Sequence, residues 1–452
     1  MTTTGRRMIL RSLFASKLFS FLELEGISYV VVGDTRDYPC ISSDIDIVIE
    51  AAVMPTITQI IYRFCKAHDA RVIQILRHEQ ASLYFVCALA DQTNELHFIQ
   101  PDICSDYLRC GQLFLKADEL LNKRTRTNYG GEGAMSFYVP APPQAFIYYL
   151  LKKIDKKDIN NSQGSYLTAE WNKNPDGAMA QLLMFLPVSD ATLIANAAKN
   201  NAWSEVSSNL SHLQKTLRSR LPFSVKQRYW EIIRRVLRVS QPTGMHVAFL
   251  GADGAGKSTI IEQLERDLAP AFRNTKRYHL RPFFGRHNDS TTPVIDPHGK
   301  PLRNTFSSLS KLGLWWLDYV LGYSIEVFPR LVRSTLVLFD RYYYDLLVDH
   351  KRYRYGGSLW LAGLVGAFIP RPDLVIFLDA PAEVLRQRKQ EVPAIEINRQ
   401  RTAYQELIKR LRNGHLVDAS LPFDKVLAQV EKCILDFMER RTAKRLKMPI
   451  LH

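Results

Sequence analysis

The chain has 452 residues, too many for one ordinary domain and enough for two or three. Its apolar and aromatic content is that of a globular protein, and no low-complexity tract is present. The net charge of +15 suits acidic partners, and the simplest interpretation is a basic enzyme that handles polyphosphates. Charge alone is weak evidence for nucleic-acid binding, which we do not expect.

The N-terminal residues 1–26 are basic, but charged residues interrupt any signal-like apolar run. We expect an amphipathic helix there. The six cysteines form no CxxC pair, and most lie in apolar surroundings, as reduced buried thiols do. A cytoplasmic location is therefore expected.

The first part of the chain alternates helix and strand patterns. Residues 27–34 are a β-branched run that ends in glycine, and residues 43–50 alternate as a half-buried strand does. Two further strands are expected within residues 81–90 and 95–103. Around residues 123–133 the chain turns polar and glycine-rich, and VPAPPQ then marks a break.

Asp44 and Asp46 alternate on the second of these strands, so both point to the same side of it. Two carboxylates placed in this way bind the Mg²⁺ ions that carry a nucleoside triphosphate. The strand, loop and Asp-Ile-Asp strand resemble the polymerase-β-like nucleotidyltransferase superfamily. The resemblance implies a third carboxylate, Asp102 or Glu95, and we favour Asp102 because it ends its strand. It also suggests that the basic helix at 150–158 holds the triphosphate.

The chain departs from that superfamily at Gly33-Asp34, where such enzymes carry Gly-Ser. An added carboxylate beside phosphates is unfavourable unless it binds metal. Both an active nucleotidyltransferase and an inactive or binding-only version of the fold are left open.

From Phe146 to about Ser240, apolar residues recur at three- to four-residue spacing, which predicts helices. QPTG at 241–244 is a short linker. The expected organisation is an α/β nucleotidyltransferase-like domain at 1–135, a helical segment packed on it at 136–240, and a third domain at 241–452.

The third domain opens with GADGAGKS, residues 251–258, which satisfies the phosphate-loop pattern between a strand and a helix. Glycines let backbone N–H groups turn toward phosphate oxygens at a helix N-terminus. Lys257 adds a positive charge for the β- and γ-phosphates, and the Ser258 hydroxyl can hold Mg²⁺. The residues expected to bind the nucleotide are Gly251, Gly254, Gly256, Lys257, Ser258 and Thr259.

Two apolar stretches follow, GLWWLDYVLGYSIEVF and LWLAGLVGAFI. Asp318 and Glu326 interrupt the first, and the second is about half the ~20 residues that a membrane span needs. We expect buried core helices, with peripheral membrane contact as the alternative. A homodimer is also left open.

A second buried strand within 334–345 delivers Asp340 and Arg341 to the phosphate loop of a parallel sheet. Asp340 can organise Mg²⁺ and its waters, and Arg341 can hold an acceptor oxyanion. A third strand within 373–381 leads into a basic stretch.

That basic stretch contains Arg386, Arg388 and Lys389. We expect it to close over the transferring phosphates, with Arg386 and Lys389 on one helix face. A solvated helix face is the alternative.

GADGAGKST, FDRY and PDLVIFLDAPAEVLRQRKQE, followed by AYQEL, resemble the thymidylate kinase group of nucleoside monophosphate kinases over residues 245–435. The resemblance implies a P-loop fold with a parallel sheet, which uses ATP and Mg²⁺. It implies that Asp253 faces the acceptor and that Asp340 and Arg341 hold acceptor phosphate and metal-bound water. Arg386 and Arg388 would stabilise the transferring phosphoryl group. The loop 413–420 would pack against adenine.

The acceptor region departs from that group. Thymidylate kinases usually follow Asp-Arg-Tyr with a serine and an Ala-Tyr-Gln that help to read thymine, whereas this chain has RYYYDLLVDHKRYRYGG. The loop 278–301 is also long. The stretch with Arg352 and Arg354 suits a sugar or phosphorylated glycan as well as a nucleotide, although a packed helix accounts for some tyrosines. Similar chains are encoded in bacterial exopolysaccharide gene clusters, and this resemblance points to a carbohydrate-linked acceptor.

The leading interpretation is an ATP- and Mg²⁺-dependent kinase that moves a γ-phosphoryl group to a nucleotide or glycan acceptor. The alternatives are a nucleotidyltransferase that uses Asp44 and Asp46, two coupled enzymes, or a nucleotide-gated scaffold. A switch has little use for several arginines at the transferring group, which argues against the scaffold.

Overall fold

A computed structural model describes residues 3–41, 43–77, 79, 81–90, 95–129, 135–283, 301–389 and 393–446. The chain folds into two compact units. The first consists of Met1–Val236 with Thr442–His452, and the second of Leu237–Arg441.

A mixed sheet forms the centre of the first unit, in the order β1-β2-β6-β4-β3 with β5 beside β4. Its strands are β1 (Tyr29–Val31), β2 (Ile45–Ile49), β3 (Arg71–Leu76), β4 (Ser82–Ala90), β5 (Leu96–Ile99) and β6 (Pro101–Cys104). These confirm the four strand patterns read from the sequence, the last of which divides into β5 and β6. β2 and β6 run parallel, whereas the other neighbours are antiparallel.

Alternate residues of β2 enter two different cores, because strand side chains point to opposite faces in turn. Ile45 and Ile47 pack with helices α1 (Thr3–Leu24) and α2 (Ile57–Ala67). Val48 packs on the other face with a helical bundle. Asp46 therefore points toward the bundle side of the sheet.

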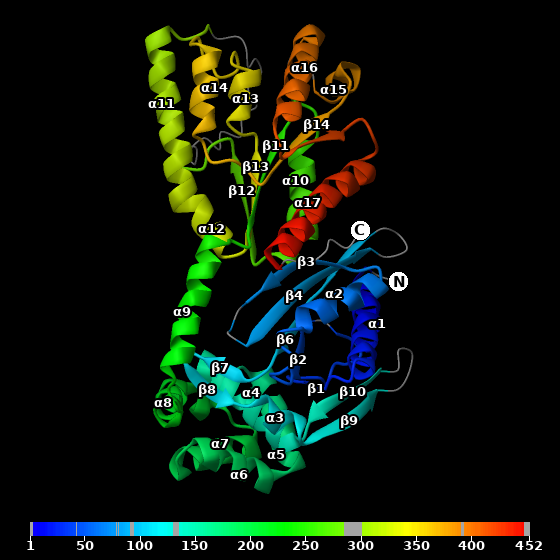
Figure 1. Cartoon of the computed structure of the whole chain (residues 1–452), viewed down its shortest axis with the longest axis vertical. Helices are drawn as coiled ribbons and strands as arrows, with labels where there is room; N and C mark the ends of the chain where they lie inside the picture. The colour runs from blue at the N-terminus through cyan, green and yellow to red at the C-terminus, as the bar shows by residue number, and fades with distance from the viewer. Residues whose placement is uncertain are drawn as a thin grey trace. The chain divides into compact units, whose positions relative to one another are not determined.

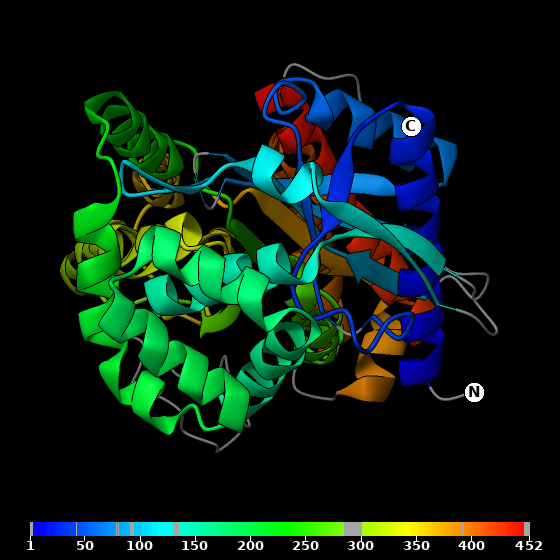
Figure 2. The same ribbon diagram turned by 90° about the horizontal axis from the view of Figure 1, so that it is seen from below.

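The bundle begins with α4 and confirms the helical pattern of the middle segment. Its helices are α4 (Pro142–Lys156), α5 (Asn161–Lys173), α6 (Pro175–Phe185), α7 (Val188–Asn200) and α8 (Ser204–Arg220), followed by α9 (Val225–Ser240). Figure 2 shows α5 to α8 gathered on one side of the strands of this unit and α1 on the other.

Short elements complete the first unit. They are the hairpin of β7 (Tyr107–Arg109) and β8 (Gln112–Leu115), the helix α3 (Ala117–Leu121), and the hairpin of β9 (Arg124–Tyr129) and β10 (Met135–Pro140). The polar segment that follows Lys123 thus folds in part as a strand. Met135 and Phe137 are buried on the partner strand, and their alternation was the available signal.

The second unit contains a parallel sheet in the order β12-β13-β11-β14-β15. Its strands are β11 (Met245–Leu250), β12 (Asn274–His279), β13 (Thr335–Asp340), β14 (Leu374–Asp379) and β15 (Gly414–Asp418). Every residue of β11, β13 and β14 is buried, as expected of parallel strands covered on both faces. This confirms the P-loop α/β fold expected from the sequence.

Helices cover both faces of this sheet, with α11 and α14 on one side and α10 and α17 on the other (Figure 1). The helices are α10 (Lys257–Asp267), α11 (Thr305–Gly322), α12 (Phe328–Val332), α13 (Tyr344–Val348), α14 (Leu359–Ala367), α15 (Ala382–Arg388), α16 (Ala394–Arg410) and α17 (Phe423–Leu446). A π-helical turn, Tyr323–Val327, joins α11 to α12.

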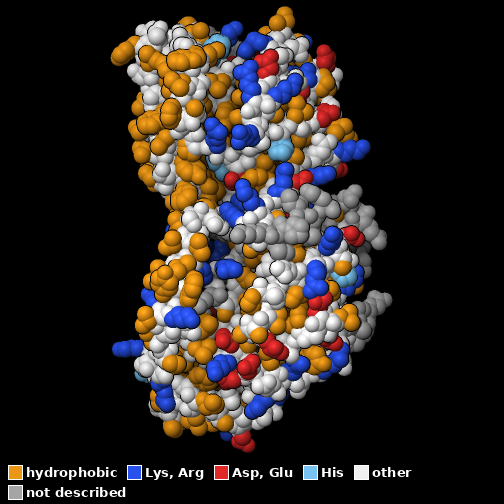
Figure 3. All heavy atoms as spheres, viewed as in Figure 1, with side chains coloured by type: hydrophobic (Ala, Val, Ile, Leu, Met, Phe, Trp, Pro, Cys, Tyr) orange, Lys and Arg blue, Asp and Glu red, His pale blue; other side chains and the backbone are white. Residues whose placement is uncertain are grey.

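The two apolar stretches are helices, but they are not both buried. Trp315 on α11 is 4% exposed, whereas Trp360 on α14 is 75% exposed and Phe368 just after it is 69% exposed. The expectation of a buried core helix was therefore wrong for α14, where only Ala362 is fully covered, and it holds for only one face of α11, on which Leu314 is 60% exposed. Figure 3 shows hydrophobic side chains gathered over α11. None of the helices in the part of the chain described here is long and apolar enough to cross a membrane.

The linker before β11 depends on a glycine. A Cβ atom added at Gly244 would lie 2.6 Å from the Leu331 Cα and 2.6 Å from the Thr335 carbonyl oxygen, both of them backbone atoms. We expect Gly244→Ala to lower the free energy of unfolding by about 1–3 kcal/mol, as overpacking does. Gly313, exposed within α11 with open space around its Cα, is the matched control.

Gly313→Ala should instead stabilise the protein by about 0.5–1 kcal/mol, because alanine loses less backbone entropy in a helix. Urea unfolding followed by circular dichroism measures both changes. A Gly244→Ala protein as stable as wild type would contradict the close packing at this linker.

Candidate active site

The phosphate loop, residues 251–258, connects β11 to α10 at the carboxyl edge of the parallel sheet. Gly256 caps α10 with φ = +82°, and Gly254 has φ = +85°, a region that glycine enters without strain. A Cβ at Gly254 would also lie 2.9 Å from the Leu385 carbonyl oxygen and 3.6 Å from the Arg388 Cβ. The loop therefore packs directly against the end of α15.

Lys257 is buried at the start of α10. Its Nζ donates hydrogen bonds to the carbonyl oxygens of Gly251 (2.9 Å) and Ala252 (3.0 Å). Burial, followed by the charge of Arg341, lowers the pKa of Lys257 to about 8. Phosphate oxygens in the loop would give this ammonium group the anionic partner that the carbonyl groups do not supply.

Ser258 and Asp340 provide oxygen ligands at the same edge. The Ser258 Oγ donates to the Asp340 Oδ2 at 3.0 Å, and Arg277 on β12 donates to the same oxygen at 3.1 Å. A hydroxyl and a carboxylate fit Mg²⁺, which prefers oxygen and is usually shared with substrate phosphates. Among the described residues, no three His, Cys, Asp or Glu side chains are grouped to hold a metal ion by themselves. Thr259 is exposed on the same first turn.

Asp253 of the phosphate loop and Arg341 after β13 are in direct contact. The Arg341 guanidinium is buried and donates to the carboxylates of Asp253 and Asp345. Arg352 donates to the other oxygen of Asp253 at 2.5 Å. Burial alone would raise the pKa of Asp253, but the charges of Arg341, Arg352 and Lys257 outweigh it and hold that pKa well below its ordinary value. Asp253 therefore stays ionised.

The backbone of Arg341 is unusual. Its φ of +73° lies in the left-handed region, which costs a non-glycine residue free energy. Its N–H donates to the Phe249 carbonyl oxygen at 3.0 Å, so the turn after β13 is fixed to β11.

The tyrosines of this stretch are structural. Tyr342 and Tyr343 are buried and donate to the carbonyl oxygens of Pro370 and Ala362. Tyr404 donates to the Asp345 Oδ1 at 2.9 Å, which orients the carboxylate behind Arg341. A packed segment thus accounts for the first tyrosines, whereas Arg341 and Arg352 reach Asp253 of the phosphate loop.

The basic stretch after β14 differs from the expected helix. α15 ends at Arg388, and Lys389 has an extended backbone (φ = −157°), so Arg386 and Lys389 do not share a helix face. All three side chains are exposed, and Arg388 donates to the Ala419 carbonyl oxygen at 3.0 Å. Residues 390–392, the end of the predicted stretch, lie outside the described residues.

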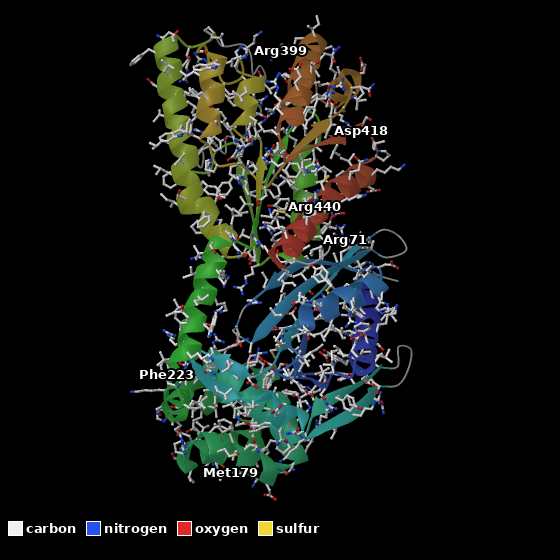
Figure 4. The ribbon with its side chains drawn as sticks, viewed as in Figure 1. Arg71, Met179, Phe223, Arg399, Asp418 and Arg440 are labelled. Carbon is white, nitrogen blue, oxygen red and sulfur yellow. The ribbon has the colours of Figure 1, made fainter. Side chains whose placement is uncertain are left out.

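The segment 413–420, predicted as a loop, is mostly strand β15. The reason is its parallel pairing with β14, in which Asp418 is the partner of Asp379. Figure 4 labels Asp418 where β15 ends, and Arg399 on α16. Asn413 and the turn at Ala419 and Ser420 remain outside the sheet, and the Ala419 N–H donates to the Asp379 carbonyl oxygen at 2.6 Å.

Sequence reasoning missed Arg277 and His279 beside Asp340, of which Arg277 is the cation, since burial lowers the pKa of His279. Arg277 binds the Asp340 carboxylate, and His279 is the neighbour of Asp340 in the parallel register of β12 and β13. The alternation of Arg277 and His279 on a short polar strand was the available signal. The long loop at 278–301 falls largely on residues 284–300, which lie outside the described residues.

In the first unit, Asp46 and Asp102 are direct partners on the parallel strands β2 and β6, and Asp44 precedes β2. Tyr84 donates to Asp44 at 3.0 Å and Ser82 to Asp102 at 2.7 Å. Burial, followed for Asp102 by the charge of Asp46, raises the pKa of Asp44 and Asp102.

Glu95, the alternative third carboxylate, is exposed and precedes β5, which pairs only with β4 in this sheet. The structure therefore brings Asp102, not Glu95, beside Asp46.

The basic helix predicted at 150–158 is the end of α4, and it approaches the carboxylates. Lys152 Nζ lies 3.6 Å from Asp46 Oδ1, and that carboxylate raises the pKa of Lys152. Asp34, the residue that departs from the nucleotidyltransferase pattern, is paired with Arg36 at 2.5 Å. A cavity of about 300 Å³ adjoins Gly33 and is lined by β1, β9, β10, α4 and α5.

Comparisons with known proteins cover less than half of the chain. No protein-family model matches the chain. It is 28% identical over 226 residues to the thymidylate kinase of Xanthomonas campestris pv. campestris (strain B100), covering 47% of this chain and 90% of the relative. It is 30% identical over 210 residues to the thymidylate kinase of Xanthomonas oryzae pv. oryzae (strain PXO99A), covering 43% and 85%. The crystal structure of thymidylate kinase from Ehrlichia chaffeensis is similar with 18% identity and a TM-score of 0.32, covering 42% of this chain and 98% of that one.

The fold and the comparisons define a P-loop kinase, a phosphotransferase that uses ATP and Mg²⁺. The chain belongs to the thymidylate kinase family. The match spans less than half of the chain, so the larger part has no counterpart in these relatives.

The lowered pKa of Lys257 predicts a pH dependence of nucleotide binding. Bound phosphate favours the ammonium form, so the complex raises this pKa and binding takes up a proton above pH 8. Affinity for ATP should be level below about pH 7 and fall by up to about tenfold per pH unit above pH 8.

Titration of a fluorescent ATP analogue between pH 6.5 and 9.5 at constant ionic strength measures this. The Lys257→Met protein should bind the ATP analogue weakly, and its affinity should not decline with pH, because the titrating group is gone. An affinity that stays level to pH 9.5 in the wild type would contradict the assignment.

Proposed function

We propose that the protein transfers the γ-phosphoryl group of ATP to a phosphate group already present on its acceptor. The observation that carries this is the state of Asp253, an ionised carboxylate held between Arg341 and Arg352. Its depressed pKa makes it a weak base, so it cannot readily take a proton from a neutral hydroxyl. An acceptor phosphate is ionised without help and is a ligand that arginine holds well.

In the reaction, an oxygen of the acceptor phosphate forms a bond to the γ-phosphorus of ATP, and the bond between that phosphorus and the β–γ bridging oxygen breaks. ADP leaves with the electron pair, the acceptor gains a phosphoanhydride, and no proton must be transferred. Mg²⁺, held with the help of Ser258 and Asp340, would reduce the negative charge on the β- and γ-phosphate oxygens.

The remaining charges fit this transfer. Lys257 lies in the loop for the β- and γ-phosphates, and the Cβ of Arg388 lies beside the same loop at Gly254, while its guanidinium donates to the Ala419 carbonyl oxygen. Arg386, which precedes Arg388 on α15, is exposed. Positive groups fixed before the reaction stabilise the developing charge most effectively, because they need not reorganise.

Two classes of acceptor meet these requirements, a nucleoside monophosphate and a phosphorylated carbohydrate. The nucleotide is supported by the family relationship. The carbohydrate, in cytoplasmic steps of bacterial surface polysaccharide synthesis, is supported by the departures in residues 341–357, where arginines face the loop. A neutral sugar is disfavoured by the weak basicity of Asp253.

The first test uses ATP labelled on the γ-phosphate, Mg²⁺ and matched acceptors: thymidine monophosphate, glucose 1-phosphate and glucose. We expect label on a monophosphate and none on glucose. Lys257→Ala should lower transfer by at least ~10²-fold, the scale on which one stabilising charge acts. Lys409→Ala, exposed near the end of α16, is the matched control and should change nothing.

Thin-layer chromatography of the products shows which acceptor carries the label. Labelled glucose would contradict the requirement for an ionised acceptor. Transfer that survives in Lys257→Ala would place the chemistry elsewhere.

A nucleotidyltransferase in the first unit is the second candidate. It is favoured by the pairing of Asp46 with Asp102 on parallel strands and by Lys152 at 3.6 Å from Asp46. Two carboxylates on one side of a sheet can share Mg²⁺ with a triphosphate. An inactive version of the fold that only binds nucleotide remains the alternative to it.

ATP labelled on the α-phosphate separates these alternatives. An active site would transfer this label and release pyrophosphate, and Asp44→Asn with Asp46→Asn should abolish that transfer while γ-label transfer continues. Nucleotide binding to the Lys257→Ala protein without α-label transfer would identify a binding-only site.

A further inference from the structure

A group of basic side chains surrounds the indole ring of Trp315 in the second unit. The Lys311 Nζ lies 5.3 Å from the ring centroid and the Arg281 Cζ lies 5.6 Å from it. Arg303 and Arg354 belong to the same group, because the charges of both lower the pKa of Lys311, and the backbone N–H of Arg303 donates to the Arg354 carbonyl oxygen at 3.1 Å. We call these four basic residues the Trp315 cation cluster.

Lys311 lies on α11, whereas Arg303 and Arg354 lie in segments without helix or strand that are bonded to neighbouring backbone. Lys311 donates to the Tyr353 carbonyl oxygen at 2.5 Å, and Arg354 Nε donates to the Pro301 carbonyl oxygen at 3.0 Å. A Cβ at Gly356 would lie 2.2 Å from the Arg303 carbonyl oxygen, so the two segments are in direct contact. The charges are therefore placed before any ligand arrives.

Carboxylates do not balance this charge. Arg281 pairs with buried Asp318 at 3.4 Å. Arg303, Lys311 and Arg354 form no ion pair with a carboxylate of the described residues. Burial, followed by the charges of Arg303, Arg281 and Arg354, lowers the pKa of Lys311 to about 8. Partly buried cations in this state are unfavourable until an anion joins them.

The cluster is continuous with the acceptor side of the kinase site. Tyr353 packs against Trp315 with ring centroids 5.1 Å apart, and its hydroxyl donates to the Asp345 Oδ2 at 3.3 Å. Asp345 is the carboxylate that holds Arg341. One tyrosine therefore separates the cluster from the residues around Arg341, which suits a single acceptor that reaches both.

We propose that the Trp315 cation cluster binds a second anionic group of the acceptor. The acceptor would thus carry one phosphate at Arg341 and Arg352 and a further phosphate or carboxylate at Lys311, Arg303 and Arg354. This proposal rests on the proposed function, since it describes the acceptor of that reaction. It narrows the acceptor to a monophosphate with another negative charge at some distance.

The experiment compares acceptors that differ only in the second group. The pairs are glucose 1-phosphate against glucuronic acid 1-phosphate, glucose 1-phosphate against glucose 1,6-bisphosphate, and thymidine 5′-monophosphate against thymidine 3′,5′-bisphosphate. Calorimetry on the full chain should show at least about tenfold tighter binding of one doubly anionic member, because charge-assisted hydrogen bonds supply that difference. The doubly anionic compound that binds most tightly identifies the second group as a carboxylate or a phosphate.

Lys311→Gln with Arg354→Gln should reduce that preference to about twofold. Arg410→Gln removes the same kind of charge from an exposed helix position and should keep the full preference. Arg303→Gln alone should give a partial loss, and it keeps the proposal testable if the double variant fails to fold.

Equal binding of every pair by the wild type would overturn the proposal, as would a preference that survives in the double variant. Phosphoryl transfer from ATP, measured on the same proteins, separates the two claims. Phosphoryl transfer without any preference for a doubly anionic acceptor would contradict the proposed role of the cluster and leave the proposed function standing. A binding preference for the doubly anionic compound without phosphoryl transfer to any monophosphate would contradict the proposed function. The cluster would then be an anion-binding site only.

Discussion

The buried guanidinium of Arg341 is the interaction on which the kinase site depends. A buried charge is unfavourable unless it is paired, and here Asp253 from the phosphate loop and Asp345 from α13 share it. Arg341 thereby ties the loop after β11 to the segment after β13. The left-handed backbone at Arg341 is stabilised by its hydrogen bonds. The guanidinium donates to Asp253 and Asp345, and the backbone N–H donates to the Phe249 carbonyl oxygen.

The parallel sheet explains why these groups meet at all. The carboxyl ends of β11, β13 and β14 deliver Gly251, Asp340 and Asp379 to one edge, although these residues are far apart in sequence. In open parallel sheets that edge is where ligands bind. The first unit uses a related device on a mixed sheet, since only its parallel pair, β2 and β6, places Asp46 beside Asp102.

Patterns that depend on neighbours in the sequence were predictable, and long-range partners were not. The phosphate loop and its flanking strand follow from local spacing, and the structure confirms both, whereas Asp44 lies just before β2, so that only Asp46 of the expected alternation is on the strand. Nothing in the spacing says that Arg352 reaches Asp253 across 99 positions, or that Tyr342 is buried. The early end of α15 at Arg388 and the pairing of residues 414–418 as β15 likewise arise from tertiary contacts.

The two anion sites of the kinase unit differ in what fills them without a substrate. Arg341 and Arg352 already hold a carboxylate of the chain, whereas Lys311, Arg303 and Arg354 hold none from the described residues. An acceptor phosphate must therefore compete with Asp253, and a singly charged acceptor gains only the difference between two anions. A second anionic group meets no such competitor, so its binding free energy can offset the cost of displacing Asp253. On our proposal, selectivity for a doubly anionic acceptor follows from this asymmetry rather than from the shape of the pocket.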